Sequence, residues 1–458
     1  MPMAILCLQL KYNSRMRTTV YLPLEVFQRE YAGKLALALK LVDAGFKVII
    51  GHVHFVRDYA LDSSSPGIYY DIKGQSLANQ RYLEYLKNAG FRIVLQDEEA
   101  GINYVEYADF ALLRPEVRNL DLFDVIFAYG QKDFEYLVKH NFNSRILLTG
   151  SPRTSLWGDL GANFYSDLVD QYKHEFGEYI LFVSNNTFQN GFINRRRAMA
   201  LKAASGYKKT YSKAERKRKT WEIESANVNF KVIDNLLEKT NLNIVIRPHP
   251  VEHSGTWSER FAGVRRIFVK DEGAITPLIL GAKFLIHNSS TVGLESIALG
   301  IPTFTLSRLV HAQGFKFLSD ELANKIGFVD NFSRILDSHN ESLADLSLLH
   351  NAITNLGDVK AIDNQVEIIS QIAHGIKGTS LNRTPFIDES SNLIRRAIRR
   401  LIYGKNEFAM LDKVKRPEIT LQNINDDVEN FKSIFGIRSS INIVKLNRST
   451  FELDSLIS

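Results

Sequence analysis

The most constraining feature of the sequence is a repeated alternation of short β-prone runs with helix-like segments. In the first 150 residues, the apolar runs FKVIIGH and FRIVLQ each follow a segment of helical spacing that ends on a glycine, Gly45 or Gly90. Glycine commonly terminates a helix, and strands that alternate with helices favour a parallel sheet with helices on both faces. The alternation begins again after Pro152. The pattern predicts an α/β protein with two Rossmann-like, doubly wound domains facing a cleft, where ligands bind beyond the carboxyl ends of the strands.

The length of 458 residues exceeds one ordinary core, which agrees with two domains and an extension. We predict an N-terminal Rossmann-like domain over 1–155 and a C-terminal Rossmann-like domain over 156–375. A basic insertion at about 191–222 interrupts the second domain, and a helical, basic extension covers 376–458. Charge runs such as the insertion are usually solvated loops, but this one is also suited to clamp an anionic acceptor or a lipid surface.

The extension contains the segment LIRRAIRRLIYGK, at 393–405, in which apolar residues share one helical face and four arginines lie beside it. This pattern predicts an amphipathic helix. Two interpretations stay open: the helix packs against the body of the protein, or it lies in an anionic membrane interface.

Composition limits the class of protein further. The single cysteine, Cys7, excludes an internal disulfide framework and a cysteine-rich zinc site and favours a reducing compartment. We find neither a signal-peptide pattern nor an apolar run of the roughly 18 residues that a membrane span needs. We therefore expect a cytoplasmic protein, with peripheral attachment to the inner membrane face as an open alternative.

The formal net charge of +6 and the pI of about 9.0 favour anionic partners. Nucleic acid is not the expected partner, because only Tyr207 and Tyr211 are interleaved with the first basic run, whereas nucleic-acid binders use interleaved aromatic residues.

A polar cluster lies between an apolar run and a helix-like segment in FLIHNSSTVGLESIALGIPTF, at 284–304. In a parallel α/β unit, the end of a strand leads into the N-terminus of the next helix, where backbone N–H groups and the helix dipole favour phosphate. Ser289, Ser290 and Thr291 can cap the helix and donate hydroxyls to phosphate oxygens, although plain capping is an equal alternative. Glu295 either accepts from ribose hydroxyls or faces solvent.

The segment IRPHP ends another predicted strand and places Arg247 and His249 at the same edge of the sheet. Arginine offers a fork for phosphate, and histidine can donate to phosphate or to a leaving group. A histidine between prolines is also typical of a rigid turn. Together with the cluster around His287, the segment predicts two opposing walls of a nucleotide-phosphate site.

Three consecutive carboxylates, Asp97, Glu98 and Glu99, follow an apolar strand of the first unit. Crowded negative charge raises the pKa of at least one of them, which can then act as a base or a nucleophile. Acidic residues at a helix N-terminus are the alternative. No second acidic or histidine cluster has ligand spacing, so we expect no metal. Further candidates for an acceptor site or cleft wall are Glu25, Arg29, Glu30, Ser151 and Arg153.

These motifs, in their order and spacing, resemble the bacterial surface carbohydrate biosynthesis proteins, a family of glycosyltransferases with the two-Rossmann GT-B fold. The resemblance runs from Thr19 to Arg308 and resumes near Asp427. It rests on segments such as LQDEEAG, NIVIRPHPVEHSGTW and IHNSSTVGLESIALGIPTF. The chain is more distantly similar to bacterial sialyl-, polysialyl- and Kdo transferases, which use CMP-activated sugars.

The resemblance implies roles for individual residues. His249 and Pro250 match the His-Pro motif that contacts the CMP phosphate, and Ser289 to Thr291 match the motif that also holds it. The acidic motif supplies the catalytic carboxylate, but Ala100 departs from its pattern, which leaves open whether Asp97, Glu98 or Glu99 reacts. The expected catalytic set is Asp97, Glu98, Glu99 and His249. The expected donor-binding set is Arg247, Pro250, His287, Asn288, Ser289, Ser290, Thr291 and Glu295. The resemblance thus implies that the domain over 156–375 binds the nucleotide-sugar donor and that the domain over 1–155 binds the acceptor.

The expected function is therefore sugar transfer from a nucleotide-activated donor, and a CMP-sugar is the favoured donor. The expected acceptor is a growing surface polysaccharide, such as capsule or lipopolysaccharide, or a lipid-linked glycan. Neither a metal nor a cofactor is expected, because His249 and a helix N-terminus can neutralise the leaving phosphate. Two alternatives stay open: a CDP-glycerol-type polyol-phosphate transferase of the same fold, and a non-catalytic GT-B scaffold in polysaccharide assembly.

Overall fold

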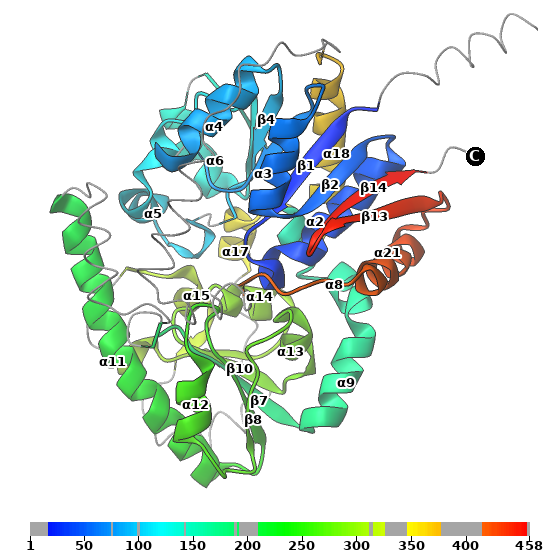
Figure 1. Ribbon diagram of the computed structural model, residues 1–458. Helices are drawn as coiled ribbons and strands as arrows, with labels where there is room; N and C mark the ends of the chain where they lie inside the picture. The colour runs from blue at the N-terminus through cyan, green and yellow to red at the C-terminus, as the bar shows by residue number, and fades with distance from the viewer. Residues whose placement is uncertain are drawn as a thin grey trace, which may run out of the picture.

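The computed structural model contains two β-sheets built mainly of parallel strands, each with helices on both faces (Figure 1). The residues that the structure describes are 17–74, 77–98, 101–141, 143–186, 190–191, 209–310, 315–325, 346–376 and 415–455. This arrangement confirms the predicted fold class of two Rossmann-like units with GT-B-like organisation.

The first sheet has the strand order β13-β14-β2-β1-β3-β4-β5-β6, and its strands from β1 to β6 are parallel. The chain leaves β1 for β2 on one side and then returns to β3 on the other side, so the topological switch point lies between β1 and β3. The strands are β1 (Thr19–Leu24), β2 (Lys47–His52), β3 (Ile68–Asp71), β4 (Arg92–Leu95), β5 (Val125–Ala128) and β6 (Arg145–Leu148). The helices between them are α2 (Phe27–Asp43), α3 (Val53–Asp62), α4 (Leu77–Asn88), η1 (Gly101–Asn103), α5 (Tyr107–Leu113), η2 (Pro115–Arg118) and α6 (Gln131–His140).

The second sheet has the order β12-β11-β10-β7-β8-β9, and all its pairs are parallel. Its switch point lies between β7 and β10. The strands are β7 (Tyr179–Val183), β8 (Asn243–Arg247), β9 (Ile267–Val269), β10 (Phe284–His287), β11 (Thr303–Thr305) and β12 (Asn324–Lys325). Between the two sheets, α7 (Pro152–Ser155) contacts α2, and α8 (Asp159–Phe164) buries Phe164 in the same core, so both belong to the first domain. The helices of the second domain are α9 (Ser166–Phe176), α11 (Lys209–Lys239), α12 (Ser254–Arg260), α13 (Thr276–Gly281), α14 (Val292–Ala298), η3 (Ser307–Leu309) and α15 (Leu318–Leu322).

The central strands are buried on both faces, which explains their continuous apolar sequences. Every residue of β7 and of β10 is buried, and so is every residue of β8 after Asn243. Strands covered by helices on both sides cannot alternate apolar with polar residues.

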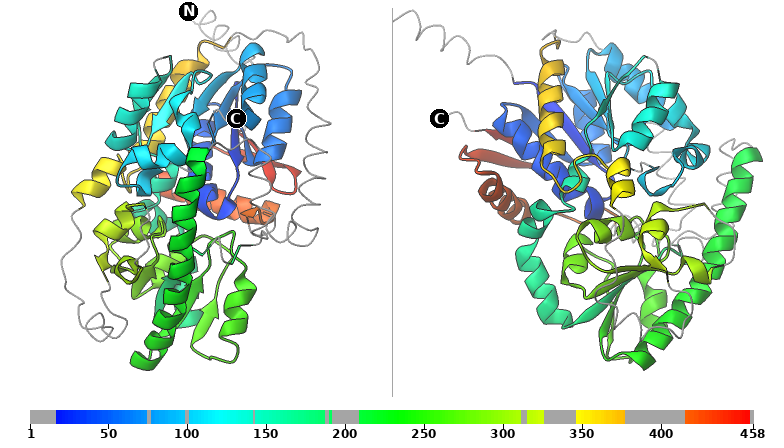
Figure 2. Two further views of the ribbon diagram at one scale, coloured as in Figure 1. Left: turned by 90° about the vertical axis from the view of Figure 1, so that its left-hand side faces the viewer. Right: turned by 180° about the vertical axis from the view of Figure 1, so that it is seen from behind.

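The chain returns to the first domain well before residue 375 (Figure 2). α17 (Ser347–Ala352) contacts α6 and buries Leu349 and Ala352 in a cluster with residues of both domains. α18 (Lys360–Ala373) buries Ile362 and Ile369 in the same core as α2 of the first domain. The predicted boundary of the second domain at 375 is therefore wrong.

The described part of the C-terminal extension also belongs to the first domain. α21 (Leu421–Phe435) places Phe431 against Phe164, with ring centroids 4.0 Å apart. β13 (Ile441–Asn447) and β14 (Thr450–Ser455) form an antiparallel hairpin, and β14 pairs with β2. The predicted amphipathic helix at 393–405 lies outside the described residues.

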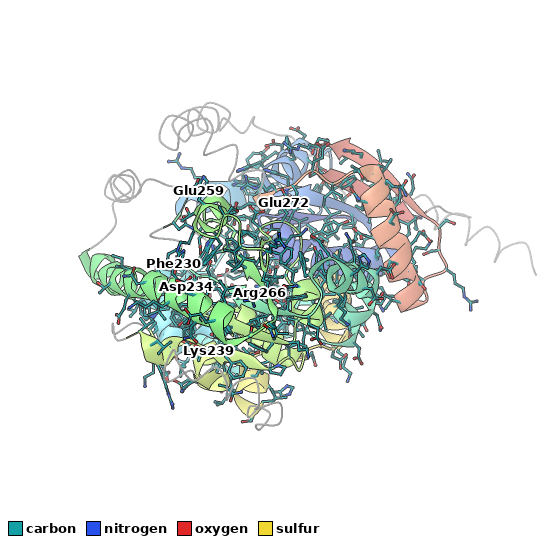
Figure 3. The ribbon with its side chains drawn as sticks, turned by 90° about the horizontal axis from the view of Figure 1, so that it is seen from below. Phe230, Asp234, Lys239, Glu259, Arg266 and Glu272 are labelled. Carbon is teal, nitrogen blue, oxygen red and sulfur yellow. The ribbon has the colours of Figure 1, made fainter. Side chains whose placement is uncertain are left out.

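The basic insertion is helical from Lys209 onward, where α11 begins, so the loop interpretation is wrong for this part of it. Residues 192–208 lie outside the described residues. Further along α11, Phe230 packs on Trp257 with ring centroids 5.1 Å apart, and Asp234 accepts from Arg260 at 2.8 Å (Figure 3). These contacts fix α11 on α12. Among the helices that the structure describes, none has the length and apolarity needed to cross a membrane.

A buried carboxylate at the start of α6 predicts a pH dependence of stability. Asp133 accepts the backbone N–H groups of Tyr129 at 2.8 Å and Gly130 at 2.7 Å, and burial raises its pKa to about 6. Because the pKa is higher in the folded state, the protonated Asp133 side chain stabilises the fold at pH values below the ordinary pKa of 3.8. This stabilisation is lost as the pH rises through about 6.

We therefore compare the wild type with Asp133→Asn, which cannot ionise. The unfolding free energy of the wild type relative to the variant should fall by about 2 kcal/mol between pH 4 and pH 7. Urea denaturation at several pH values measures this difference, in which the other titrating groups cancel. A difference that does not change with pH contradicts the prediction.

Candidate active site

A cavity of about 410 Å³ lies between the two domains, where the carboxyl ends of both sheets meet. The first domain contributes residues after β1, β4 and β5 and from α7. The second contributes residues after β7, β8 and β10. The polar and charged lining of the cavity includes Arg29, Glu98, Asn103, Arg153, Ser184, Asn185, Arg247, His249, Thr276, Ser289, Ser290, Thr291 and Glu295.

The loop after β10 is held in an unusual backbone conformation. Ser289 has a φ of 49°, which side-chain-bearing residues rarely adopt, and its hydroxyl donates to Asp320 at 2.6 Å. Ser290 Oγ accepts the N–H of Val292 at 3.3 Å. Ser289, Ser290 and Thr291 all line the cavity. Because the Ser289 hydroxyl is engaged with Asp320, Ser290 and Thr291 are the better candidates for contacts with a ligand.

Two predicted donor residues lie beneath this loop rather than in the cavity. His287 and Asn288 are fully buried, and neither lines the cavity. His287 Nδ1 accepts the N–H of Ser290 at 3.3 Å, and burial lowers its pKa to about 3, so the imidazole is neutral. The structure thus contradicts their placement at the nucleotide: His287 supports the loop from below.

Arg247 lines the cavity, but its guanidinium is committed elsewhere. It donates to the carbonyl oxygens of Lys270, Glu272 and Gly273 at 3.1, 2.6 and 2.5 Å. It also donates to Gln28 Oε1, on α2 of the other domain, at 2.8 Å. The predicted phosphate fork is therefore occupied by these acceptors, and Arg247 braces the two domains against each other.

His249 and Pro250 line the cavity directly after β8. The Nδ1 atom of His249 accepts the backbone N–H of Val251 at 3.3 Å. A neutral imidazole whose Nδ1 accepts carries its proton on Nε2, so Nε2 is the donor. Pro250 adds an apolar contact surface beside it.

A residue outside the predicted site set, Glu252, holds this edge of the sheet together. Glu252 is buried and accepts from the Ser184 hydroxyl at 2.8 Å, the Asn186 N–H at 2.6 Å and the Trp257 indole at 3.2 Å. It also accepts the N–H of His249 at 3.4 Å. Burial raises the pKa of Glu252, and these donors oppose the rise. Its only sequence signal is an acidic residue three positions after the histidine.

Asp97 and Glu98 have different surroundings in the structure. Asp97 forms two contacts of 3.1 Å with Arg114 and does not line the cleft cavity. Glu98 lines the cavity. Glu99 lies outside the described residues. Of the two described carboxylates, Glu98 is the one that a ligand in the cavity can reach.

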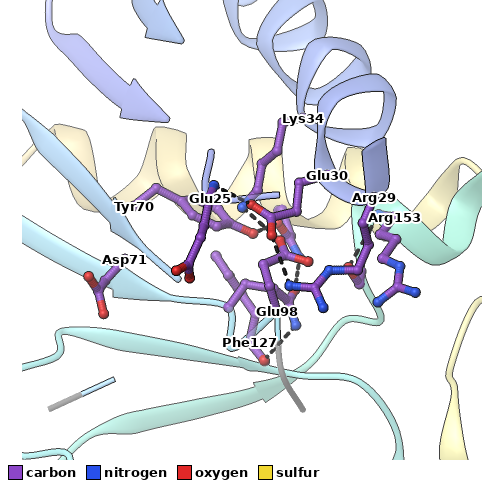
Figure 4. Close-up of polar contacts among 12 residues, drawn as sticks. Glu25, Arg29, Glu30, Lys34, Tyr70, Asp71, Glu98, Phe127 and Arg153 are labelled. Atoms are coloured by element: carbon purple, nitrogen blue, oxygen red, sulfur yellow. Dashed lines mark hydrogen bonds and ion pairs between the residues drawn. The ribbon is translucent and has the colours of Figure 1, made fainter. Parts of the chain in front are cut away.

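Glu98 is supported from behind by a buried network (Figure 4). Lys34 Nζ lies 2.9 Å from Glu98 Oε1, and the two side chains are only 2% and 3% exposed. The ammonium also lies 3.8 Å from the centre of the Tyr70 ring, whose hydroxyl donates to Gln365 of α18 at 2.8 Å. Removing charges from water is costly, so a buried pair beside a cavity indicates a functional site.

Two arginines of the first domain line the cavity beside Glu98, as Figure 4 shows. Arg29 lies 2.9 Å from Glu30, and burial lowers the pKa of Arg153. Both positions agree with the predicted cleft wall. Their positive charges face the loops of the second domain that carry His249 and Ser290.

Three other predicted wall residues do not line the cavity. Glu25 pairs with Lys73 at 2.8 Å. Glu30 is buried and accepts the N–H of Glu25 at 2.8 Å, and burial raises its pKa. Ser151 is a buried cap of α7 that accepts the N–H of Arg153 at 3.2 Å. Each side chain is already engaged in local hydrogen bonds or an ion pair.

Glu295 lines the cavity from the first turn of α14 and does not face solvent. It accepts the Thr276 hydroxyl at 2.6 Å, and burial raises its pKa, opposed by Arg153. Within the part of the chain that the structure describes, no group of three histidine, cysteine or acidic residues is arranged to hold a metal ion.

The chain matches no protein-family model and no curated protein. Among solved structures, it is similar to the wall teichoic acid polymerase TagF, with 11% identity over 80% of this chain and 91% of that chain and a TM-score of 0.48. It is also similar to a UDP-GlcNAc 2-epimerase of Methanocaldococcus jannaschii, with 12% identity over 78% and 100% of the chains and a TM-score of 0.47. A third similar structure is S. aureus MnaA with UDP, with 15% identity over 80% and 99% and a TM-score of 0.46.

Proposed function

We propose that this protein is a glycosyltransferase that moves a sugar from a nucleotide-activated donor to an acceptor in surface polysaccharide synthesis, and that it uses no metal. The observation that carries the proposal is the convergence on one cavity of polar strand ends from the second domain and of Glu98 from the first. The switch point of a doubly wound sheet, here between β7 and β10, is the usual place for a nucleotide.

In this proposal the second domain binds the donor. The hydroxyls of Ser290 and Thr291 and the Nε2–H of His249 donate to the phosphate oxygens, and Arg29 and Arg153 add positive charge from the opposite wall. The leaving nucleotide carries the electron pair of the broken bond between sugar carbon and phosphate oxygen. Donors arranged in advance around that phosphate stabilise the charge that develops on it.

Glu98 is the proposed general base. An acceptor hydroxyl loses its proton to the Glu98 carboxylate while its oxygen forms a bond to the sugar carbon. The ion pair with Lys34, 2.9 Å from Glu98 Oε1, fixes the position of the carboxylate beside the cavity. The closed cavity excludes water that would otherwise hydrolyse the donor.

Two alternatives use the same cavity. In a polyol-phosphate transferase the acceptor oxygen attacks phosphorus of a CDP-glycerol-type donor, and CMP leaves. In a non-catalytic scaffold the nucleotide binds without turnover. Three further points are proposals from the sequence: the identity of the acceptor, attachment to the inner face of the membrane, and a membrane contact through 393–405.

Nucleotide binding tests the proposal directly. We expect CMP or CDP, but not UDP, GDP or ADP, to raise the melting temperature of the wild type. A ligand at about 100 times its dissociation constant stabilises the fold by roughly 2.7 kcal/mol. His249→Ala should lose the shift, because the Nε2 donor is removed.

His253→Ala is the matched control, since His253 is exposed four residues away and does not line the cavity. A shift with UDP or GDP alone keeps a nucleotide site but overturns the cytidine donor. Absence of any shift overturns the transferase proposal.

A further inference from the structure

One side of the cavity is aromatic, and the proposed nucleotide contacts do not use it. Tyr104, Phe110, Trp221 and Phe317 all line the cavity, and we call them the aromatic wall. The ring centroids of Tyr104 lie 5.7 Å from Phe110 and 5.2 Å from Phe317, and Phe317 lies 6.0 Å from Trp221. Tyr104 and Phe317 are half-buried, so their rings are accessible from the cavity.

Both domains build this wall. Tyr104 and Phe110 follow β4 in the first domain, whereas Trp221 lies on α11 and Phe317 precedes α15 in the second. An isolated antiparallel bridge joins Tyr104 to Phe317, and the N–H of Val105 donates to the Lys316 carbonyl at 3.1 Å. The wall therefore requires both domains.

Hydrogen bonds connect the segment that carries Tyr104 to the proposed phosphate loop and to α6. Asn103 Nδ2 donates to the Ser289 carbonyl at 3.3 Å, and Asn103 Oδ1 accepts the N–H of Ser319 at 2.9 Å. Lys132 Nζ donates to the carbonyl oxygens of Ile102, at 3.3 Å, and Tyr104. Glu98 lies only six residues before Tyr104. A ligand on the wall is thus held beside the proposed base and the proposed phosphate loop.

The chemistry of the wall distinguishes two classes of acceptor. A pyranose ring is rigid and has an apolar face of C–H groups, which packs on the flat face of an aromatic side chain. A polyol phosphate is acyclic and flexible, and cations and hydrogen-bond donors recognise it instead. Aromatic side chains supply large, rigid contact areas with a preferred geometry.

We propose that the aromatic wall is the acceptor subsite and that it binds a pyranose ring, so that the acceptor is a glycan rather than a polyol-phosphate chain. This inference rests on the proposed transferase function. It further specifies the class of acceptor, on which the nucleotide-binding residues carry no information.

Saturation-transfer NMR on the full chain, with the cytidine nucleotide bound, tests the subsite. The probes are methyl pyranosides of glucose, galactose, mannose and N-acetylglucosamine, against glycerol 3-phosphate and ribitol 5-phosphate. We expect at least one pyranoside to bind and neither polyol phosphate to bind. Tyr104→Leu and Phe317→Leu keep an apolar side chain but remove the flat face, and each should weaken pyranoside binding about three- to tenfold.

Phe315→Leu is the matched control, because the Phe315 ring lies 5.7 Å from Tyr104 but does not line the cavity. It should bind the pyranoside as the wild type does. Binding of polyol phosphates alone, binding of neither class, or unchanged affinity in both leucine variants overturns the subsite. Failure of the transferase proposal is recognised separately: no nucleotide then raises the melting temperature of the wild type.

Discussion

Replacing Glu98 with glutamine is expected to lower turnover by about 10² to 10⁴-fold while nucleotide binding stays unchanged. Glutamine keeps the size and the hydrogen-bonding oxygen of the side chain but cannot accept the acceptor proton. Glu98 lines the cavity, and its carboxylate is paired with Lys34 at 2.9 Å. Release of the nucleotide from the donor, followed over time, measures turnover, and the nucleotide thermal shift measures binding.

Asp97→Asn is the matched control, because Asp97 is adjacent in sequence but pairs with Arg114 away from the cleft cavity. It should lose much less turnover than Glu98→Gln. A fully active Glu98→Gln protein together with an inactive Asp97→Asn protein would reverse the assignment of the base.

Adding one methyl group at Gly33 is expected to destabilise the protein by about 3 kcal/mol, the upper part of the range for an overpacked core. A Cβ at Gly33 would lie 2.7 Å from the Pro152 carbonyl oxygen and 2.8 Å from the Arg153 nitrogen. Both atoms belong to the backbone of α7, so α7 must move as a unit, and it carries the Arg153 side chain that lines the cavity. The melting temperature of Gly33→Ala measures the effect.

Gly300→Ala separates this steric cost from backbone strain. Gly300 has a φ of 74°, but a Cβ there would meet no atom within 4 Å. Its replacement should cost only the strain of the left-handed conformation, about 1–2 kcal/mol. If Gly33→Ala lowers the melting temperature no more than Gly300→Ala does, close approach of α2 to α7 is not the reason for the glycine.

Most strands could be predicted because continuous apolar runs between glycine-terminated helices are typical of parallel sheets. β3 was missed, since four residues between a proline–glycine pair and a polar turn carry little pattern. The hairpin of β13 and β14 was missed because its burial is uneven: only Thr450, Phe451 and Leu453 are buried. α18 was assigned to the second domain only because of its place in the chain, since a helical period contains no information about which sheet covers it.

The candidate site divides in the same way. We expected polar residues at the carboxyl ends of parallel strands to meet, because these ends lie at one edge of a sheet. His249, Ser290, Thr291 and Glu98 do line one cavity. The same expectation was wrong for His287, which is buried beneath its loop. Strand position decides where a backbone ends, whereas neighbouring side chains and carbonyls decide where a side chain points.

The sequence by itself determined the two-domain α/β architecture and the edges at which polar residues gather, because both follow from local periodicity along the chain. Only the tertiary structure decided that Arg247 braces the domains, that Glu98 rather than Asp97 reaches the cavity, and that an aromatic wall joins Tyr104 to Phe317. These features depend on contacts between residues far apart in the chain. Such contacts are set by packing of whole elements, and no local pattern encodes them.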